Sequence, residues 1–314
     1  MSVLVTGGAG FIGRWVVKSL LEQGQEVYVL DNLTNGSLDN LDEFRDNPKF
    51  KEPVIGDIIN RAIVKDLFGE GFDTCLHLAA SIHVHKSVDD PYTTFMNDVL
   101  GTFHILEACR KHGTRLVYMS TCHVYDQAAP NQSIGEDHPA KPVSPYAGSK
   151  LAGEKMVLSY HYAYGLPAVI LRPFNTYGPF QKGGPEGGVV SIFLQNKIAG
   201  RPLIIHGDGS QTRDLLYVED CAGFIVEVIN HREINGEIIN AGTGRDISVR
   251  DLARLIAGNE GEVCHIPHVG PRSEVPKFLC NYQKAWRLLG WNPEITIKDG
   301  LARTENWFMG VTGR

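Results

Sequence analysis

Short apolar runs and amphipathic stretches alternate along the first half of the chain. Helical spacing of apolar residues is clear at 11–24 and at 102–113, where the closing Gly113 is typical of a helix C-cap. Strands that alternate with helices predict an α/β fold, with a Rossmann-type doubly wound parallel sheet. Six apolar runs are predicted as its strands: 2–6, 26–31, 51–57, 74–80, 115–120 and 168–173.

The alternation breaks up after Pro173. Gly and Pro are frequent at 175–188, and short strand-like and helix-like stretches mix from there to the end of the chain. We therefore predict two domains, 1–173 and 174–314, the second a smaller mixed α/β substrate lobe. Some segments of this lobe are expected to return to the first domain.

Composition narrows the range of partners and compartments. The formal net charge of -6 and the lack of a long basic run argue against nucleic acid or an anionic membrane as a partner. No apolar stretch nears the ~20 residues that span a bilayer, and the first predicted strand begins almost at Met1, which predicts no signal peptide and a cytoplasmic protein. Free thiols are expected for six cysteines that form no C-x-x-C pair: Cys75, Cys109, Cys122, Cys221, Cys264 and Cys280.

The turn after the first predicted strand is rich in glycine. TGGAGFIG places Gly7, Gly10 and Gly13 between a strand and a helix, where the backbone can approach a pyrophosphate at the helix N-terminus. Asp31 ends the second predicted strand, where a carboxylate accepts from the 2′-hydroxyl of a ribose and repels a 2′-phosphate. The pattern predicts a dinucleotide site that prefers NAD to NADP.

PYAGSK places Tyr146 and Lys150 four residues apart, on one face of a helix. A phenol is a poor base at its usual pKa of ~10, but a nearby ammonium favours the phenolate, which can accept a proton from a substrate alcohol. Alone, a Y-x-x-x-K pair is common and usually means nothing; it gains meaning here from the glycine motif that precedes it.

Together with HLAA (77–80), RPFNTYGP (172–179) and QTRDLLYVED (211–220), these motifs make the chain resemble the extended short-chain dehydrogenase/reductases, the NDP-sugar epimerases and dehydratases. The resemblance implies NAD in the first domain, an NDP-sugar such as a UDP-sugar in the second, no metal, and a homodimer through helices near 95–112 and 148–163.

The resemblance also implies site residues. It assigns cofactor contacts to Gly7, Gly10, Phe11, Ile12, Gly13, Asp31, Asn32, Asp57, Ile58, Leu78, Ala79, Ala80, Tyr146 and Lys150. It assigns substrate contacts to Ser81, His83, Thr121, Asn175, Arg213 and Arg272. Asp57 as an ordinary strand-end cap is the alternative to an adenine contact. Arg272 sits one residue closer to the following acid than is usual in the family, and Asp98 stands where the family has Asn.

The segment STCHVY (120–125) bears on the reaction. Thr121 matches the family's catalytic Ser/Thr, while Cys122 and His123 stand where 4,6-dehydratases carry the acid and base, Asp and Glu. Both side chains can transfer protons, and which gives and which takes stays open; packing alone is the alternative for each. His83 and His85 alternate onto one face of an extended chain, which we interpret as cavity lining or loop histidines.

We predict an NAD-dependent dehydratase acting on a UDP-hexose or UDP-N-acetylhexosamine. Transient C4 oxidation, C5 deprotonation and loss of the 6-hydroxyl would follow one another. If hydride returns to C4, the product keeps a 5,6-alkene (an exo-glycal), as in the UDP-N-acetylglucosamine 5,6-dehydratases of antibiotic biosynthesis, which the chain resembles. The alternatives are a UDP-hexose or UDP-N-acetylhexosamine 4-epimerase, a UDP-glucuronate decarboxylase and a non-catalytic NAD(H)-sensing protein.

Overall fold

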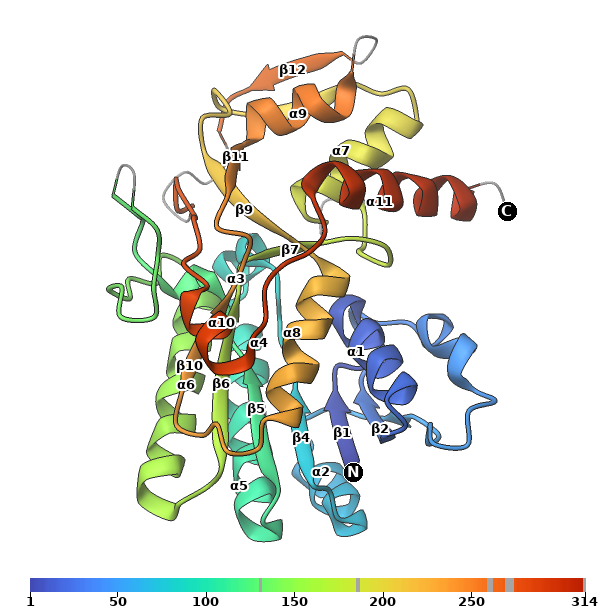
Figure 1. The fold of residues 1–314 in the computed structure, drawn as a ribbon, viewed down its shortest axis with the longest axis vertical. Coiled ribbons are helices and arrows are strands. Elements are labelled where there is room, and N and C mark those ends of the chain that lie inside the picture. The colour runs from blue at the N-terminus through green and yellow to red at the C-terminus, as the bar shows by residue number, and fades with distance from the viewer. Residues whose placement is uncertain (130–131, 185–186, 259–261, 269–273, 313–314) are drawn as a thin grey trace.

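A seven-stranded parallel sheet forms the centre of the computed structural model (Figure 1), which describes residues 1–129, 132–184, 187–258, 262–268 and 274–312. The strand order is β10-β6-β5-β4-β1-β2-β3, which includes the 3-2-1-4-5-6 order of a Rossmann sheet and confirms the predicted fold class. The strands are β1 Ser2–Thr6, β2 Glu26–Asp31, β3 Val54–Ile55, β4 Thr74–His77, β5 Arg115–Met119, β6 Ala168–Pro173 and β10 Ile238–Ala241.

The predicted strand at 51–57 is wrong in length, because only Val54–Ile55 forms β3 beside β2. Pro53 has no N–H to donate and interrupts the ladder just before it. The predicted strand at 74–80 also ends early, at His77, where the chain turns away and Ala79 N donates to the Thr6 hydroxyl.

Helices cover both faces of the sheet, as the alternation of apolar residues along β1 requires. Val3 and Val5 point to one core and Leu4 to the other. The first face is covered by α1 Phe11–Glu22, α8 Val218–Asn230 and α10 Gln283–Leu289. The second is covered by α2 Arg61–Leu67, α5 Thr102–His112 and α6 Pro145–Tyr164. Gly113, in the left-handed region, ends α5 as predicted.

A smaller C-terminal domain sits beyond the carboxyl ends of the strands (Figure 1). It has its own apolar core, around Phe193, Leu252 and Phe308. Its strands are β7 Asn175–Tyr177, β9 Thr212–Tyr217 and β11 Asp246–Ser248 in one sheet, with β8 Leu203–His206 and β12 Val263–Ile266 in another. Its helices are α7 Val189–Ile198, α9 Val249–Ala257 and α11 Ile297–Thr312.

Segments far along the chain complete the central layers. β10 pairs in parallel with β6, and α8 packs against α1 in the core on the first face. The chain therefore passes between the two parts of the molecule several times. The domain boundary at 173/174 stays a prediction.

The segment after β4 is helical rather than extended. It forms α3 Val84–Asp89, α4 Pro91–Phe95 and the π-helical η3 Met96–Gly101. The interpretation of His83 and His85 as neighbours on an extended chain is wrong, because the Ser87 amide donates to the His83 carbonyl and begins a helix there. Short 3-10 segments lie at η1 Leu38–Phe44, η2 Phe68–Glu70 and η4 Cys122–Val124.

All six cysteines are free thiols, as expected. Within the described parts of the chain, no helix combines the length and the apolar character needed to cross a membrane.

Candidate active site

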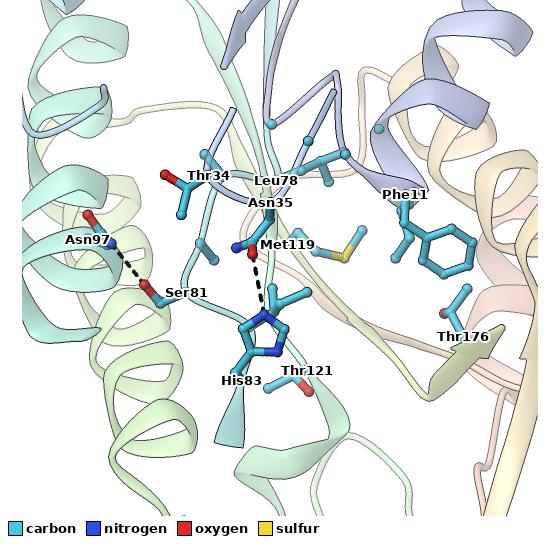
Figure 2. Close-up of a pocket in the computed structure, with 18 of the residues that line it drawn as sticks. Phe11, Thr34, Asn35, Leu78, Ser81, His83, Asn97, Met119, Thr121 and Thr176 are labelled. Carbon is cyan, nitrogen blue, oxygen red and sulfur yellow. Dashed lines mark hydrogen bonds between the residues drawn. The ribbon is translucent and has the colours of Figure 1, made fainter. Parts of the chain in front are cut away.

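A cavity of about 350 Å³ runs along the carboxyl edge of the sheet, where ligands bind in open α/β folds (Figure 2). It gathers most of the predicted site residues. Those that line it are Gly7, Gly10, Phe11, Ile12, Gly13, Asp31, Asn32, Asp57, Ile58, Leu78, Ala79, Ala80, Ser81, His83, Thr121, Cys122, His123, Tyr146, Lys150 and Asn175.

The glycines after β1 are required by close backbone contacts. Gly7 has a φ of +76°, and a Cβ there would lie 2.8 Å from Ala79 N; a Cβ on Gly13 would lie 2.2 Å from Gly7 O. Gly10 caps α1 without a side chain, so no side-chain acceptor occupies the free amides of the first turn. The turn fits a pyrophosphate bound at the helix N-terminus.

Asp31 fits a ribose contact at the end of β2. Its Oδ2 accepts from Ala9 N (3.0 Å) and its Oδ1 from Leu33 N (2.8 Å). Burial raises the pKa of Asp31, and these two backbone hydrogen bonds oppose the rise. Each oxygen keeps a lone pair for a ligand hydroxyl. These residues therefore fit the adenosine end of NAD.

Asp57, at the next strand end, has the role of a strand-end cap. It lines the cavity, and it also caps the local turn by accepting from Asn32 Nδ2 (2.8 Å) and Ile59 N (3.0 Å). The cap accounts for the carboxylate by itself, so its contact with adenine stays a prediction.

Tyr146 lies on the first turn of α6, with its ring buried beside the cavity. Burial raises the pKa of its phenol above the usual range, the Asp98 charge raises it further, and hydrogen bonding with Thr121 opposes the rise. The lowered phenol pKa that the sequence suggested is therefore not seen in this structure.

Lys150 follows one turn later, with only 3% of its surface exposed. Its Nζ lies 4.6 Å from the centroid of the Tyr118 ring. Burial lowers the pKa of this lysine, while the charges of Asp98 and Glu154 raise it. Two carboxylates thus favour an ammonium in a place where burial disfavours one.

Cys122 and His123 begin η4, at the end of β5. The Thr121 hydroxyl caps this turn by accepting from His123 N (3.2 Å). Burial raises the pKa of the Cys122 thiol to about 12 and lowers the pKa of His123 to about 4; the Arg213 charge opposes the first shift and adds to the second. At neutral pH the pair is a protonated thiol beside a neutral imidazole, one able to give a proton and the other able to take one.

The His123 ring is held by aromatic neighbours. Its centroid lies 5.1 Å from that of Phe278, edge-on, and 6.2 Å from that of Tyr146. The imidazole is therefore positioned next to the phenol, on the same wall of the cavity.

Asn175, in β7, lines the cavity with a buried Oδ1 that has no hydrogen-bond partner among the described residues. An unsatisfied buried oxygen costs free energy, so this atom fits a ligand contact.

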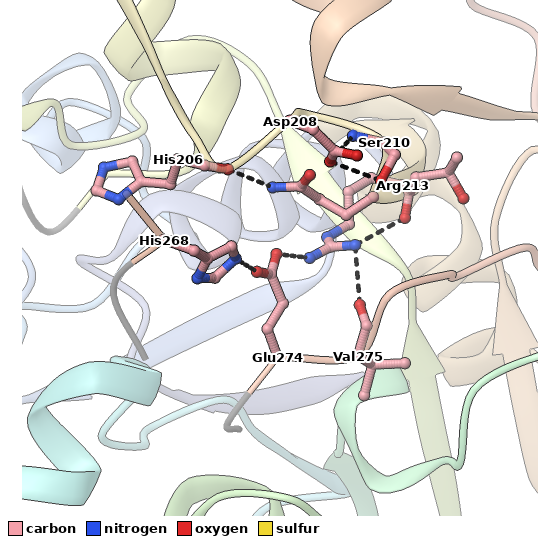
Figure 3. A network of polar contacts seen from close by, with 9 residues as sticks. His206, Asp208, Ser210, Arg213, His268, Glu274 and Val275 are labelled. Carbon is pink, nitrogen blue, oxygen red and sulfur yellow. Dashed lines mark hydrogen bonds and ion pairs between the residues drawn. The ribbon is translucent and has the colours of Figure 1, made fainter. Parts of the chain in front are cut away.

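Arg213 does not line the cavity. Its guanidinium donates to the carbonyls of Thr212 (2.8 Å) and Val275 (3.0 Å) and forms an ion pair with Glu274, which also contacts His268 (Figure 3). Contact between Arg213 and a diphosphate stays a prediction. Arg272 lies outside the described residues.

Thr34, Asn35 and Lys182 are among the residues that line the cavity and that the sequence did not indicate. His83 Nε2 lies 3.3 Å from Asn35 Oδ1 (Figure 2), and Lys182 Nζ donates to the Thr34 carbonyl (3.4 Å). The Asn-Gly turn at 35–36 was a usable signal, because loops after parallel strands bind ligands. Lys182 stands in a Gly-rich stretch that carries no such signal.

Comparison with known proteins agrees with this geometry. The profile of the NAD dependent epimerase/dehydratase family matches residues 3–242. A putative UDP-glucose 4-epimerase from Methanocaldococcus jannaschii is 38% identical over 97% of both chains. The crystal structure of Pal from Bacillus thuringiensis is 55% identical, with a TM-score of 0.98, over 99% of this chain and 100% of that one. DesIV, a dTDP-glucose 4,6-dehydratase from Streptomyces venezuelae solved with NAD bound, is 32% identical, with a TM-score of 0.92, over 100% and 98%.

Proposed function

Because the chain belongs to the NAD dependent epimerase/dehydratase family, whose cofactor is NAD, we propose that it is a nucleotide-sugar dehydratase. The substrate is a UDP-hexose or UDP-N-acetylhexosamine. One observation carries the proposal: Cys122 and His123 line the same cavity as Thr121 and Tyr146, in complementary protonation states.

The first step is oxidation of the sugar at C4. When bound, NAD supplies the hydride acceptor and later the hydride donor. Thr121 holds the 4-hydroxyl by a hydrogen bond, and the phenolate form of Tyr146 takes the proton of that hydroxyl. Lys150 keeps a positive charge next to this phenol, which favours the phenolate as the proton moves.

The second step is loss of water across C5 and C6. A ketone at C4 acidifies the C5 proton, which the neutral His123 imidazole removes. The C6–O bond breaks as the Cys122 thiol gives its proton to the departing hydroxyl, and a C5=C6 double bond forms. Return of the hydride to C4, together with the proton that Tyr146 had taken, then restores the 4-hydroxyl and leaves a 5,6-alkene. The His123 imidazolium gives its proton back to the Cys122 thiolate.

A 4-epimerase is the second candidate, and the putative UDP-glucose 4-epimerase relative favours it. Hydride leaves C4 and returns to the opposite face, which needs only Thr121, Tyr146 and Lys150. Cys122 and His123 would then serve as packing.

Incubation with a panel of UDP-sugars in D₂O separates the candidates. Mass spectrometry of a dehydrated product shows the loss of one water, and NMR shows deuterium at C5 of the recovered substrate, whereas an epimer keeps the mass of its substrate. Isomerisation without water loss for every UDP-hexose and UDP-N-acetylhexosamine would refute the dehydratase.

Two variants divide the roles of the proton-transfer pair. His123→Gln should still accumulate enzyme-bound NADH but lose C5 exchange and dehydration by about 10²-fold or more. Cys122→Ala should keep C5 exchange and lose dehydration. Cys280→Ala is the control, since Cys280 is a buried thiol of the same apolar cluster that does not line the cavity. If Cys122→Ala dehydrates the substrate at the normal rate, Cys122 serves only in packing and gives no proton.

We also propose a homodimer through α4, α5 and α6. Large apolar side chains are exposed on these adjacent helices, namely Tyr92, Phe95, Phe103 and Tyr162. Exposed apolar patches of this kind mark protein interfaces. Analytical ultracentrifugation should give a dimer for the wild type and a monomer for Phe95→Glu/Phe103→Glu. A monomeric wild type at micromolar concentration would contradict the proposal.

A further inference from the structure

Asp98 is a buried carboxylate next to the predicted catalytic helix, and the proposed reaction gives it no role. It lies in η3 with 1% of its surface exposed. Its Oδ1 accepts from Ser81 N (2.7 Å) and its Oδ2 from Ser149 Oγ (2.9 Å). The carboxylate is thus fixed between the loop after β4 and helix α6, by groups that carry no charge.

The charges of Asp98 and Glu154 both favour the Lys150 ammonium, but Glu154 also has a cation of its own. Glu154 is held by Arg172 through two hydrogen bonds, Nε to Oε1 (2.7 Å) and Nη2 to Oε2 (2.5 Å). That pair is neutral as a unit. Among the described residues Asp98 forms no ion pair with an arginine, so of these two carboxylates it is the one whose charge is left to balance the buried ammonium of Lys150.

We propose that Asp98 is a positioning residue: its carboxylate holds Lys150 as a buried ammonium and so sets the pH range in which the Tyr146–Lys150 pair works. The inference rests on the proposed roles of Tyr146 and Lys150. An Asn here would keep both hydrogen bonds, because its Oδ1 can accept from Ser81 N and its Nδ2 can donate to Ser149 Oγ. It would remove only the charge.

The other titratable groups around this site do not take over that charge. Burial lowers the pKa of His77 to about 3 and raises that of Tyr118 well above its usual value, so both are neutral near pH 7. Glu154 is committed to Arg172. Loss of the Asp98 charge therefore lowers the pKa of Lys150, by disfavouring its ammonium, and lowers the pKa of Tyr146, by favouring its phenolate.

Because both shifts have the same sign, the whole pH–rate profile of Asp98→Asn should move to lower pH, by about one unit or more. A purely structural role would lower the rate without moving the profile. Asp98→Glu keeps the charge and should return the profile toward that of the wild type.

A readout independent of turnover is the NMR titration of lysine side chains in the whole protein, with the Lys150 signal assigned by its loss in Lys150→Arg. In Asp98→Asn, Lys150 should titrate about one unit or more below the wild type. Asp89→Asn, which removes an exposed charge on α3, is the control and should leave the Lys150 titration unchanged.

An unchanged Lys150 titration in Asp98→Asn would overturn the inference. If Asp98→Asn does not fold, the Lys150 titration of the wild type still tests the inference. A Lys150 side chain that is already neutral at pH 8 would contradict the proposal that Asp98 holds it as an ammonium. If the pKa of Lys150 is lower in Asp98→Asn but the wild type dehydrates no UDP-sugar, the role of Asp98 is supported and the proposed function is refuted. The two failures are therefore distinguishable.

Discussion

Two pairs of titratable groups around one cavity differ in charge. Lys150 and Asp98 form an ionised pair, whereas Cys122 and His123 form a neutral one. Lys150 and Asp98 are almost fully buried, as is Cys122, with the half-buried His123 beside it. Burial disfavours the charged form of all four. Lys150 and Asp98 oppose this effect through each other's charge. The charge that acts on His123 is the cation Arg213, which disfavours an imidazolium further.

The difference teaches that burial alone does not decide the protonation state of a site residue. The other charges buried with it decide, and they come from distant parts of the chain. The charged pair suits electrostatic work beside a phenol and a cofactor, whereas the neutral pair suits the giving and taking of protons.

The largest expected effect comes from removing the phenol that both pairs serve. Tyr146→Phe should lower C4 oxidation by about 10²–10⁴-fold, because the substrate proton loses its acceptor. Bound NADH, followed by absorbance, and product, followed by mass spectrometry, should fall together. Product formation at an undiminished rate would remove Tyr146 from the mechanism.

The next largest effect concerns the ion pair between Arg172 and Glu154. This pair occupies the second carboxylate near Lys150 and leaves Asp98 as the counter-charge. Arg172→Met strands a fully buried Glu154 carboxylate, so the free energy of unfolding should fall by about 3–5 kcal/mol in urea titrations. The double variant Glu154→Met/Arg172→Met should recover much of that loss. A single variant that loses less than about 1 kcal/mol would show that the pair is not needed for charge balance.

Two histidines that are neutral in the folded protein should make its free energy of unfolding depend on pH in the acid range. The pKa values of His77 and His123, about 3 and about 4, lie below the unfolded value of 6.5. The unfolded chain therefore binds more protons below pH 6.5, and stability falls as the pH drops. Between pH 6.5 and 5 His77 alone accounts for up to about 2 kcal/mol.

Urea titrations at pH 7 and pH 5 measure that slope. His77→Gln and His123→Gln should each show a smaller loss of stability than the wild type over this interval. Equal slopes in all three proteins would mean that the buried imidazoles are charged, and would remove the contrast between the two pairs.

The smallest expected effect is a difference in thiol reactivity. A protonated, buried Cys122 should resist Ellman's reagent at pH 8 in the folded protein, while the partly exposed Cys264 reacts. Cys264→Ser should remove that reaction. Labelling of Cys122 before unfolding would show a thiolate in the neutral pair.

The sequence predicted those parts of the site that depend on local backbone needs. Gly7, Gly13 and Asp31 could be found because a tight turn, a close strand and a helix start leave a pattern within about thirty residues. The parallel sheet was equally clear from its apolar runs. The length of β3 was wrong because a single proline outweighed an apolar run.

The rest of the site depends on partners far away in the chain. Asp98 bonds Ser149, which is 51 residues away, and Arg213 pairs with Glu274, which is 61 residues away. Local sequence patterns do not predict contacts between residues so far apart in the chain. The sequence therefore showed Asp98 only as a departure from its family, and Arg213 was predicted to contact the diphosphate of a ligand. Protonation states were beyond reach for the same reason.

The return of β10 to the central sheet limits where this chain can be cut. A truncation after Pro173 would separate β6 from its neighbour, expose a sheet edge and uncover α1 where α8 packs. Residues 1–173 alone therefore lack part of their own core, and the chain has to be produced whole.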